Sequence, residues 1–161
     1  MSAMQTLDGH TAIKSYRQRD SWMIPYQCFV GHGEGLCKTF SPEGDFLEAS
    51  AVHMDVYWTD TTTWHLHEDF DNLYEVGKTV SHTNISVSGK TCRGDSLLVR
   101  LEGAMLTPYN YVFTFWSGVS GTIVYNNHYF LDANNRRILT HKIREGKTHI
   151  FQIQDFVRVG E

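Results

Sequence analysis

The sequence predicts an all-β fold, an antiparallel up-and-down barrel of about ten strands with a short N-terminal helix. The 161 residues include 15 Thr, 12 Val and 8 Ile but only 6 Ala, a usage typical of strands rather than helices. Short alternating segments are separated by turn residues such as Ser41-Pro42-Glu43-Gly44, which leaves no room for crossover helices. Because closure removes exposed sheet edges, a meander of this length forms a barrel most readily.

The elements follow one another along a single predicted domain, residues 1–161, in which residues 1–24 form a helical plug. The helix is expected at Thr11–Trp22, where apolar residues recur at helical spacing and Pro25 follows. After it, strands are predicted at Tyr26–Gly31, Gly35–Phe40, Phe46–Trp58, Thr63–Phe70, Thr79–Ser88, Ser96–Glu102, Tyr109–Trp116, Thr122–Leu131, Arg137–Ile143 and Thr148–Val159.

Glycines alternate with polar residues in Gly31-His32-Gly33-Glu34-Gly35. A phosphate-binding loop would need a following helix and a Lys-Ser/Thr ending, and neither is present. The spacing instead indicates a tight bend or a close approach of two backbones in a small barrel.

The hairpin predicted from Phe46–Trp58 and Thr63–Phe70 has two distinct faces. Placing Trp58 opposite Trp64 pairs apolar side chains with apolar ones and polar side chains with polar ones throughout. In this register Tyr57 faces His65, Asp55 faces His67 and His53 faces Asp69, while Val56 meets Leu66 and Val52 meets Phe70. The hairpin therefore carries a ladder of carboxylate–imidazole pairs beside a phenol.

Three interpretations of this ladder remain open. It would be the solvated outside of the barrel, where cross-strand pairs contribute about 0.2–1 kcal/mol each. On the inner wall, Asp55 would orient His67 for proton transfer, assisted by Tyr57 and His65. His65 and His67 would also begin a cupin-like metal site if a third ligand joined them on the inner wall. A cupin motif would also need a Glu a few residues on, but Glu75 lies too far along the chain and no glycine precedes His65 at the usual step. No metal and no cofactor are therefore predicted for the first two interpretations.

Aromatic residues make up 13% of the chain, more than a core of this size needs, which indicates a lined cavity. The strand Tyr109–Trp116 is apolar on both faces, so its outer face would be covered by the N-terminal helix or by the second subunit of a homodimer. On the last strand Phe151, Ile153 and Val157 are expected in the core, on the face opposite Gln152 and Gln154. The candidate ligand-binding residues are Tyr111, Phe113, Phe115 and Trp116 as apolar wall, with Arg100, Asn127 and His128 as polar anchors.

Charge and cysteine content exclude several classes of partner. With 14 Lys and Arg against 18 Asp and Glu, the net charge is −4, and no basic run tracks a nucleic acid backbone. No leader sequence and no apolar run of about 18 residues is present, so a soluble, cytoplasmic protein without a membrane span is expected. The 3 cysteines leave one unpaired in any disulfide scheme, which fits reduced thiols.

The glycine-rich segment, followed by Phe40-Ser41-Pro42-Glu43-Gly44-Asp45-Phe46, resembles the opening of a small lipocalin-like family related to phycobiliprotein chromophore lyases, within the calycin superfamily. In that family a G-x-W-x-G strand precedes an F-S-P-x-G turn. The match covers about the first third of the chain. The glycines are also similar to those of nitrobindin-like haem barrels, but no residue here matches their proximal histidine. The resemblance implies a cup-shaped cavity that holds a small, largely apolar molecule.

Two hypotheses of function follow from these predictions. The first is binding of a small hydrophobic or aromatic ligand, a pigment or a biosynthetic intermediate, in the barrel. The alternative is a cofactor-free lyase, isomerase or cyclase on the same barrel that uses the His67–Asp55 pair, with the metal-dependent cupin-like enzyme as a third option. The direction in which the 46–70 hairpin turns its polar face decides among them.

Overall fold

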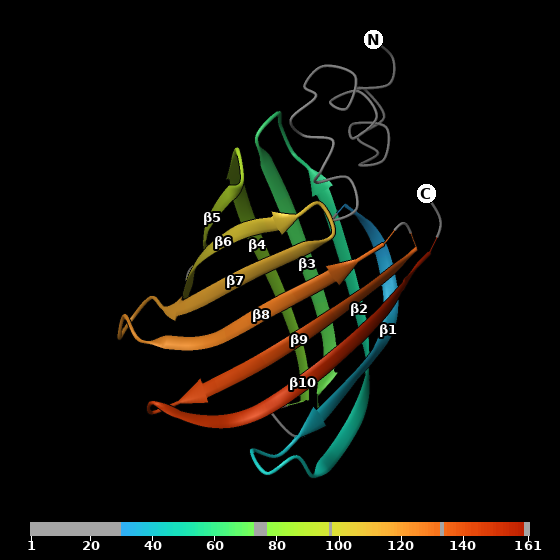
Figure 1. The fold of residues 1–161 in the computed structure, drawn as a ribbon, viewed down its shortest axis with the longest axis vertical. Coiled ribbons are helices and arrows are strands. Elements are labelled where there is room, and N and C mark those ends of the chain that lie inside the picture. The colour runs from blue at the N-terminus through green and yellow to red at the C-terminus, as the bar shows by residue number, and fades with distance from the viewer. Residues whose placement is uncertain (1–29, 73–76, 97, 133, 160–161) are drawn as a thin grey trace.

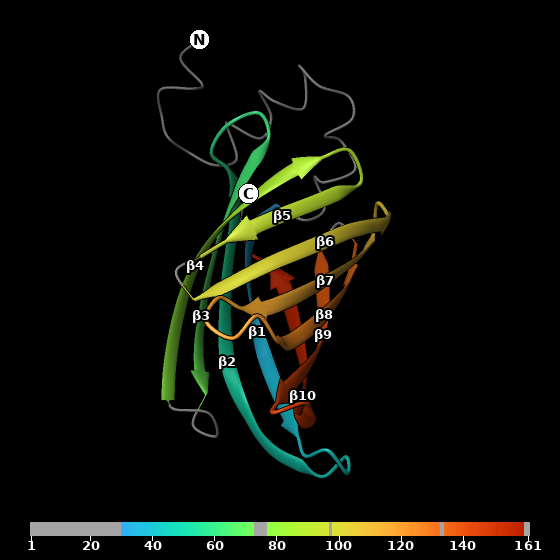
Figure 2. The same cartoon turned by 90° about the vertical axis from the view of Figure 1, so that its left-hand side faces the viewer.

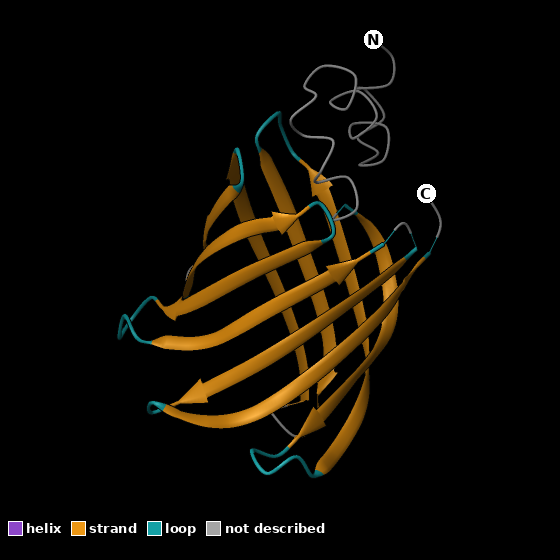
Figure 3. Cartoon of the chain, viewed as in Figure 1, coloured by secondary structure: helices purple, strands orange, loops and turns teal. Residues whose placement is uncertain are grey.

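The structure is a computed structural model that describes residues 30–72, 77–96, 98–132 and 134–159. Every regular element in this part of the chain is a strand, and no helix there is long and apolar enough to cross a membrane (Figure 3). The strands are β1 (Gly31–Phe40), β2 (Phe46–Trp58), β3 (Thr63–Asn72), β4 (Gly77–Ser88), β5 (Thr91–Asp95), β6 (Val99–Thr107), β7 (Asn110–Ser117), β8 (Ile123–Leu131), β9 (Asn135–Arg144) and β10 (Lys147–Arg158).

The strands form a closed antiparallel barrel. Each strand pairs with the next along the chain, and β10 pairs with β1 to close the ring (Figure 1). The long strands β1 to β4 make one wall and β6 to β10 cross the opposite side at an angle (Figure 2). The predicted all-β, up-and-down barrel is confirmed.

The number of strands agrees with the prediction, but two elements differ. Gly31–Phe40 is one continuous strand, whereas the prediction ended one strand at Gly31 and began the next at Gly35. Thr91–Asp95 is a strand that was not predicted. Of the two expectations for the glycines, a tight bend or a close backbone approach, the structure shows the second: the chain stays extended at Gly35, and β10 passes very close to it. A Cβ atom there would lie 1.6 Å from the carbonyl oxygen of Asp155, so only glycine fits. The predicted helix, Thr11–Trp22, lies outside the described residues.

The predicted register of the second hairpin is confirmed at every pair, from Trp58 opposite Trp64 to Val52 opposite Phe70. The two indole rings are 5.5 Å apart in an edge-to-face arrangement. Across the turn, the Thr59 amide donates a hydrogen bond of 2.9 Å to the Thr63 carbonyl. Matching each face with its like was therefore sufficient to determine this pairing.

Side chains of alternate residues fill the barrel interior. Along β3 the inner face changes from the fully buried Trp64 and Leu66 to a carboxylate, Glu68. The apolar inner residues form one cluster: Val30, Cys37, Val52, Met54, Val56, Trp58, Trp64, Leu66, Ile85, Val87, Cys92, Leu101, Tyr111, Phe113, Phe115, Tyr129, Leu131, Ile138 and Phe156.

The inner and outer faces of the last strand, β10, are exchanged relative to the prediction. Gln152 and Gln154 are each only 4% exposed and point into the barrel, whereas Phe151 and Val157 are 39% and 57% exposed. The glutamines are tolerated inside because they are hydrogen-bonded there, as the Gln152 amide is to the Thr39 hydroxyl at 3.2 Å. The interior is therefore partly polar, and hydrophobicity alone does not identify it.

Candidate functional site

A carboxylate, Glu68, lies inside the barrel on β3. It follows Trp64 and Leu66 on the inner face and pairs with Ser81 of β4, whose hydroxyl donates to Glu68 Oε2 at 3.3 Å. The side chain is half-buried rather than sealed. Glu68 is therefore an acidic group that faces the barrel interior.

Two positive side chains on the opposite side of the barrel, Arg136 and Lys142, act electrostatically on Glu68. Burial raises the pKa of Glu68 to about 7, while the Ser81 hydroxyl and the charges of Lys142 and Arg136 act in the opposite direction. Both cations belong to β9, which is separated from β3 by β2, β1 and β10 in the ring. Arg136, Lys142 and Glu68 all occupy inward-facing positions, opposite the buried Phe156, Ile150 and Met54, so the two positive charges act on Glu68 across the interior.

Two tyrosines of β8 belong to the same group. Burial first, and then the charge of Glu68, raises the pKa of both Tyr125 and Tyr129 above the ordinary value, so both phenols stay protonated. The Tyr125 ring stacks on Phe115 with centroids 4.0 Å apart, and Tyr129 meets Phe113 edge-on at 5.2 Å. The phenols of Tyr125 and Tyr129 are therefore hydrogen-bond donors whose pKa values are raised in part by the charge of Glu68, and their rings continue the aromatic wall formed by Phe113 and Phe115.

A chain of hydrogen bonds lines the neighbouring part of the interior. The Gln154 amide donates to the Thr140 hydroxyl at 3.3 Å, and that hydroxyl donates to Asn127 Oδ1 at 2.7 Å. Gln154 Oε1 and Ser50 Oγ are buried with no hydrogen-bond partner among the described residues. Such atoms offer places for a bound molecule to attach.

Arg136 spans the interior at one end. Its Nη1 lies 2.8 Å from the sulfur of Met54, which projects from β2 on a different wall. Arg136 also borders a cavity of about 20 Å³ beside Gly31, Phe156 and Arg158, room for one water molecule. This cavity by itself is too small to hold an organic ligand.

Two cations and two carboxylates occupy inward-facing positions. Arg136 and Lys142 face the interior with Glu68 and with Glu48, a residue of β2 whose Oε1 is buried. Since the pKa of Glu68 is near 7, this carboxyl is partly protonated at neutral pH. Among these four groups the positive charge then exceeds the negative.

The structure divides the predicted ligand-binding residues into two sets. Tyr111, Phe113, Phe115 and Asn127 point inward and are 0%, 3%, 6% and 7% exposed. Arg100, Trp116 and His128 do not, because each alternates with a buried neighbour and so faces outward. The Arg100 guanidinium lies over the Trp116 ring at 5.0 Å, and His128 stacks on Phe130 at 4.3 Å. Their prediction as part of an inner wall is wrong.

The predicted ladder lies on the outside of the barrel. Met54 and Val56 are 0% and 2% exposed and point inward, so the alternate residues His53 and Asp55 face outward. His67, His65 and Tyr57 share this outer face by the confirmed register. The placement of His67, Asp55, His65 and Tyr57 on the inner wall is therefore wrong, and so is that of a cupin-like metal pair. The orientation agrees with the solvated-face interpretation.

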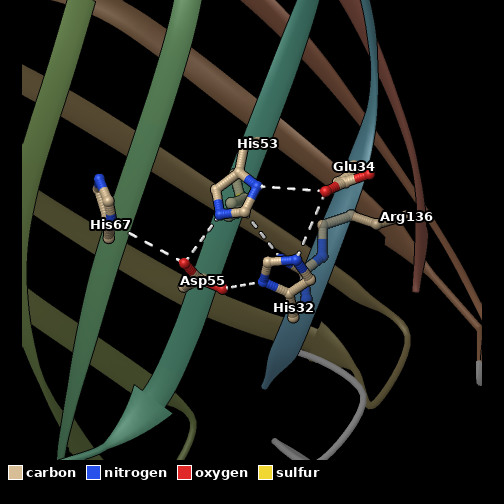
Figure 4. Close-up of polar contacts among 7 residues, drawn as sticks. His32, Glu34, His53, Asp55, His67 and Arg136 are labelled. Atoms are coloured by element: carbon tan, nitrogen blue, oxygen red, sulfur yellow. Dashed lines mark hydrogen bonds and ion pairs between the residues drawn. The ribbon is translucent and has the colours of Figure 1, made fainter. Parts of the chain in front are cut away.

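Asp55 also has different nearest partners from the predicted one. It hydrogen-bonds His32 and lies 2.9 Å from Nε2 of His53, whereas Nδ1 of His67 is 3.8 Å away (Figure 4). Burial alone would raise the pKa of Asp55, but the bonds from His32 and His53 outweigh it and hold this pKa below the ordinary value. Asp55 is therefore an ionised carboxylate shared by two imidazoles.

The inner residues that the sequence prediction missed are Glu68, Ser81, Tyr125, Tyr129, Arg136 and Lys142. One signal was present: in the predicted register Glu68 stands opposite Met54, on the apolar face of the hairpin. A carboxylate in that position costs free energy unless it has partners. It therefore indicated a polar centre inside the barrel.

The sequence matches no family model and no curated protein. Among solved structures, a protein of unknown function of the DUF3598 family from Nostoc punctiforme PCC 73102 superimposes with a TM-score of 0.64 at 12% identity, over 81% of this chain and 47% of that one. The chain thus spans about half the length of that protein. The S-type phycobiliprotein lyase CPES from Guillardia theta superimposes with a TM-score of 0.60 at 8% identity, over 84% of this chain and 91% of that one.

At these identities the likeness establishes the fold. The chain shares a closed antiparallel barrel with these two proteins, one of them a phycobiliprotein lyase, and this is the fold that the predicted resemblance implied.

Proposed function

We propose that this barrel binds a small, largely apolar molecule with an anionic group. The observation that carries the proposal is that Glu68 of β3 and Arg136 and Lys142 of β9 all occupy inward-facing positions of the barrel. Phe113 and Phe115 supply aromatic wall to the same interior. Aromatic surfaces with a few convergent polar groups are the usual composition of small-molecule sites.

The chemistry of the ligand follows from these groups. A guanidinium binds a carboxylate or phosphate through two parallel hydrogen bonds, and the phenols of Tyr125 and Tyr129 act as neutral donors. The stacked ring pairs favour a planar, conjugated body. A pigment or a biosynthetic intermediate with an acidic group fits this description, and the same barrel in a phycobiliprotein lyase supports it.

A second candidate, an enzyme that moves protons on such a ligand, is favoured by one observation. A carboxyl group whose pKa is about 7 can both donate and accept a proton at neutral pH. A lyase or isomerase on this barrel would then use Glu68, assisted by Tyr125 or Tyr129, in place of the outward-facing His67.

Titration with the aromatic sulfonate 8-anilinonaphthalene-1-sulfonate tests the binding proposal, because this probe combines a planar apolar body with an anion. We expect a single site whose affinity falls about 10–100-fold in Arg136→Gln, as for loss of a hydrogen bond to a charged group. Arg137→Gln is the matched control, since Arg137 faces outward and pairs with Asp155 at 2.6 Å. Equal affinities for the wild type and Arg136→Gln would contradict the proposal.

A further inference from the structure

We propose that a divalent transition-metal ion binds on the outside of the barrel, between His32 and Glu34 of β1 and His53 of β2. The strand register brings these residues together: His32 and Glu34 project from the same face of β1, and His53 is the direct cross-strand partner of Glu34. Figure 4 shows the three side chains directed toward one another. The site lies on the outer face of the sheet, and the proposal does not depend on the proposed interior ligand.

The spacing of the three groups suits a metal better than a direct hydrogen bond. Nε2 of His32 lies 3.7 Å from Oε1 of Glu34, and Nδ1 of His53 lies 3.8 Å from the same oxygen. Both distances are too long for hydrogen bonds. In a tetrahedral zinc site, bonds of about 2.0–2.2 Å place ligand atoms about 3.3–3.6 Å apart.

Only a small contraction separates the present geometry from a bound one. One ligand atom of each residue lies within 4.8 Å of the other two. The side chains of His32, His53 and Glu34 are 30%, 31% and 59% exposed, so they can move without repacking the core, and an ion can reach them from solvent.

Asp55 orients both imidazoles for this role. Its two oxygens accept hydrogen bonds from Nδ1 of His32 and, at 2.9 Å, from Nε2 of His53. The remaining ring nitrogens then carry their lone pairs toward Glu34. A carboxylate that holds the far nitrogen of a ligating histidine is the usual support of a metal site, since it fixes the tautomer and strengthens the ligand.

The ligand types define the class of ion. Two imidazoles and one carboxylate suit zinc and its neighbours in the first transition row, whereas calcium and magnesium prefer oxygen ligands. With three protein ligands, a fourth tetrahedral position is left for water.

Calorimetric titration of the full chain with zinc chloride tests the site, and cobalt(II) absorption reports its geometry. We expect one zinc ion per chain, a loss of affinity of more than about 100-fold in His53→Ala, and a clear loss in Glu34→Gln, an exposed position that leaves the fold intact. Asp55→Asn is expected to weaken binding about 10–100-fold and to change the cobalt spectrum, because it no longer fixes both rings.

Two variants serve as controls. His128→Ala removes an outward-facing histidine of β8, far along the ring, and should leave zinc affinity unchanged. The double variant His65→Ala, His82→Ala removes a neighbouring pair whose ring nitrogens are 3.1 Å apart, and it should also bind zinc as the wild type does. Absence of zinc binding, or equal affinity in the wild type and both His53→Ala and Glu34→Gln, would overturn the proposal.

Discussion

His67 and Glu68 are neighbours in the chain but belong to different environments. His67 faces outward beside Asp55, whose hydrogen bonds with His32 and His53 hold its pKa below the ordinary value. Glu68 faces inward, where burial raises its pKa to about 7. The two carboxylates therefore shift in opposite directions: the pKa of Asp55 on the outer face is lowered, and the pKa of Glu68 on the inner face is raised. The face of the sheet on which a polar side chain lies, rather than its residue type, determines the direction of its pKa shift.

The two walls repeat this contrast on a larger scale. On β2 and β3 the outer face is polar and the inner face is mostly apolar. On β10 the inner face includes Gln152 and Gln154, and Phe151 is on the outside. An interior with polar groups on one wall and aromatic groups beside them is suited to a ligand that has both kinds of surface.

The largest expected difference between the faces is at Trp64 and His65. Trp64→Ala should lower the free energy of unfolding by about 3–5 kcal/mol, because Trp64 is 0% exposed and its removal leaves a cavity. His65→Ala, one residue further on the outer face, should change it by less than about 1 kcal/mol. Urea denaturation measures both. Similar losses would show that the inner and outer faces are not distinct.

Closure of the barrel is tested at Gly35 and Leu36. Gly35→Ala places a methyl group against the Asp155 carbonyl and should cost about 1–3 kcal/mol or more, since β1 and β10 must separate. Leu36→Ala is the control, because this side chain is 51% exposed. If Gly35→Ala is as stable as the wild type, the close approach of β1 and β10 is incorrect.

Glu68→Gln should remove the part of the pH dependence of folding stability that comes from the Glu68 carboxyl. The carboxyl binds its proton more tightly in the folded barrel than at its ordinary pKa of 4.5, so folded-state stability falls as pH rises from about 4.5 to 7. The variant should be more stable than the wild type by about 1–3 kcal/mol at pH 8 and have a flatter profile across that window. Thermal unfolding as a function of pH provides the measurement, with Glu43→Gln in an exposed turn as control. A profile unchanged by Glu68→Gln would place this carboxylate in solvent.

The smallest effect is expected at the outer ion pair of Arg137. Its Nε and Nη2 lie 2.6 and 2.9 Å from the two oxygens of Asp155, but the pair is solvent-exposed. Arg137→Ala should therefore cost at most about 1 kcal/mol, and less in high salt. Denaturation at two salt concentrations checks this, and a loss above about 2 kcal/mol would mean that the outer face is more enclosed than the structure indicates.

Strand pairing was the most predictable part of this molecule. Like-with-like matching of Trp58 with Trp64 and of Asp55 with His67 was enough to set the hairpin register. The short strand Thr91–Asp95 was missed because its five residues include Gly94 and lack a clear alternation. Its place in the sheet depends on β4 and β6 on either side, which local sequence does not describe.

The candidate site was less predictable than the fold. Asn127, Phe113 and Phe115 were identified because they interrupt or extend aromatic strands. Arg136 and Lys142 lie on β9, and they face Glu68 of β3 across the interior only after the sheet has closed on itself. The contact of Arg136 with Met54 of β2 likewise depends on closure. No spacing along the chain records a contact across a barrel, so these partners emerge only from the closed structure.

The central claim is that the interior holds an acidic, largely apolar ligand. The neighbouring residues Arg136, which faces inward, and Arg137, which faces outward, provide its most direct test. Native mass spectrometry would be applied to the protein isolated from its own source, alongside Arg136→Gln and Arg137→Gln produced in the same cells. The account expects a small molecule bound to the wild type and to Arg137→Gln, and a strongly reduced amount on Arg136→Gln. A small molecule retained equally by all three proteins, or found on none of them, would contradict it.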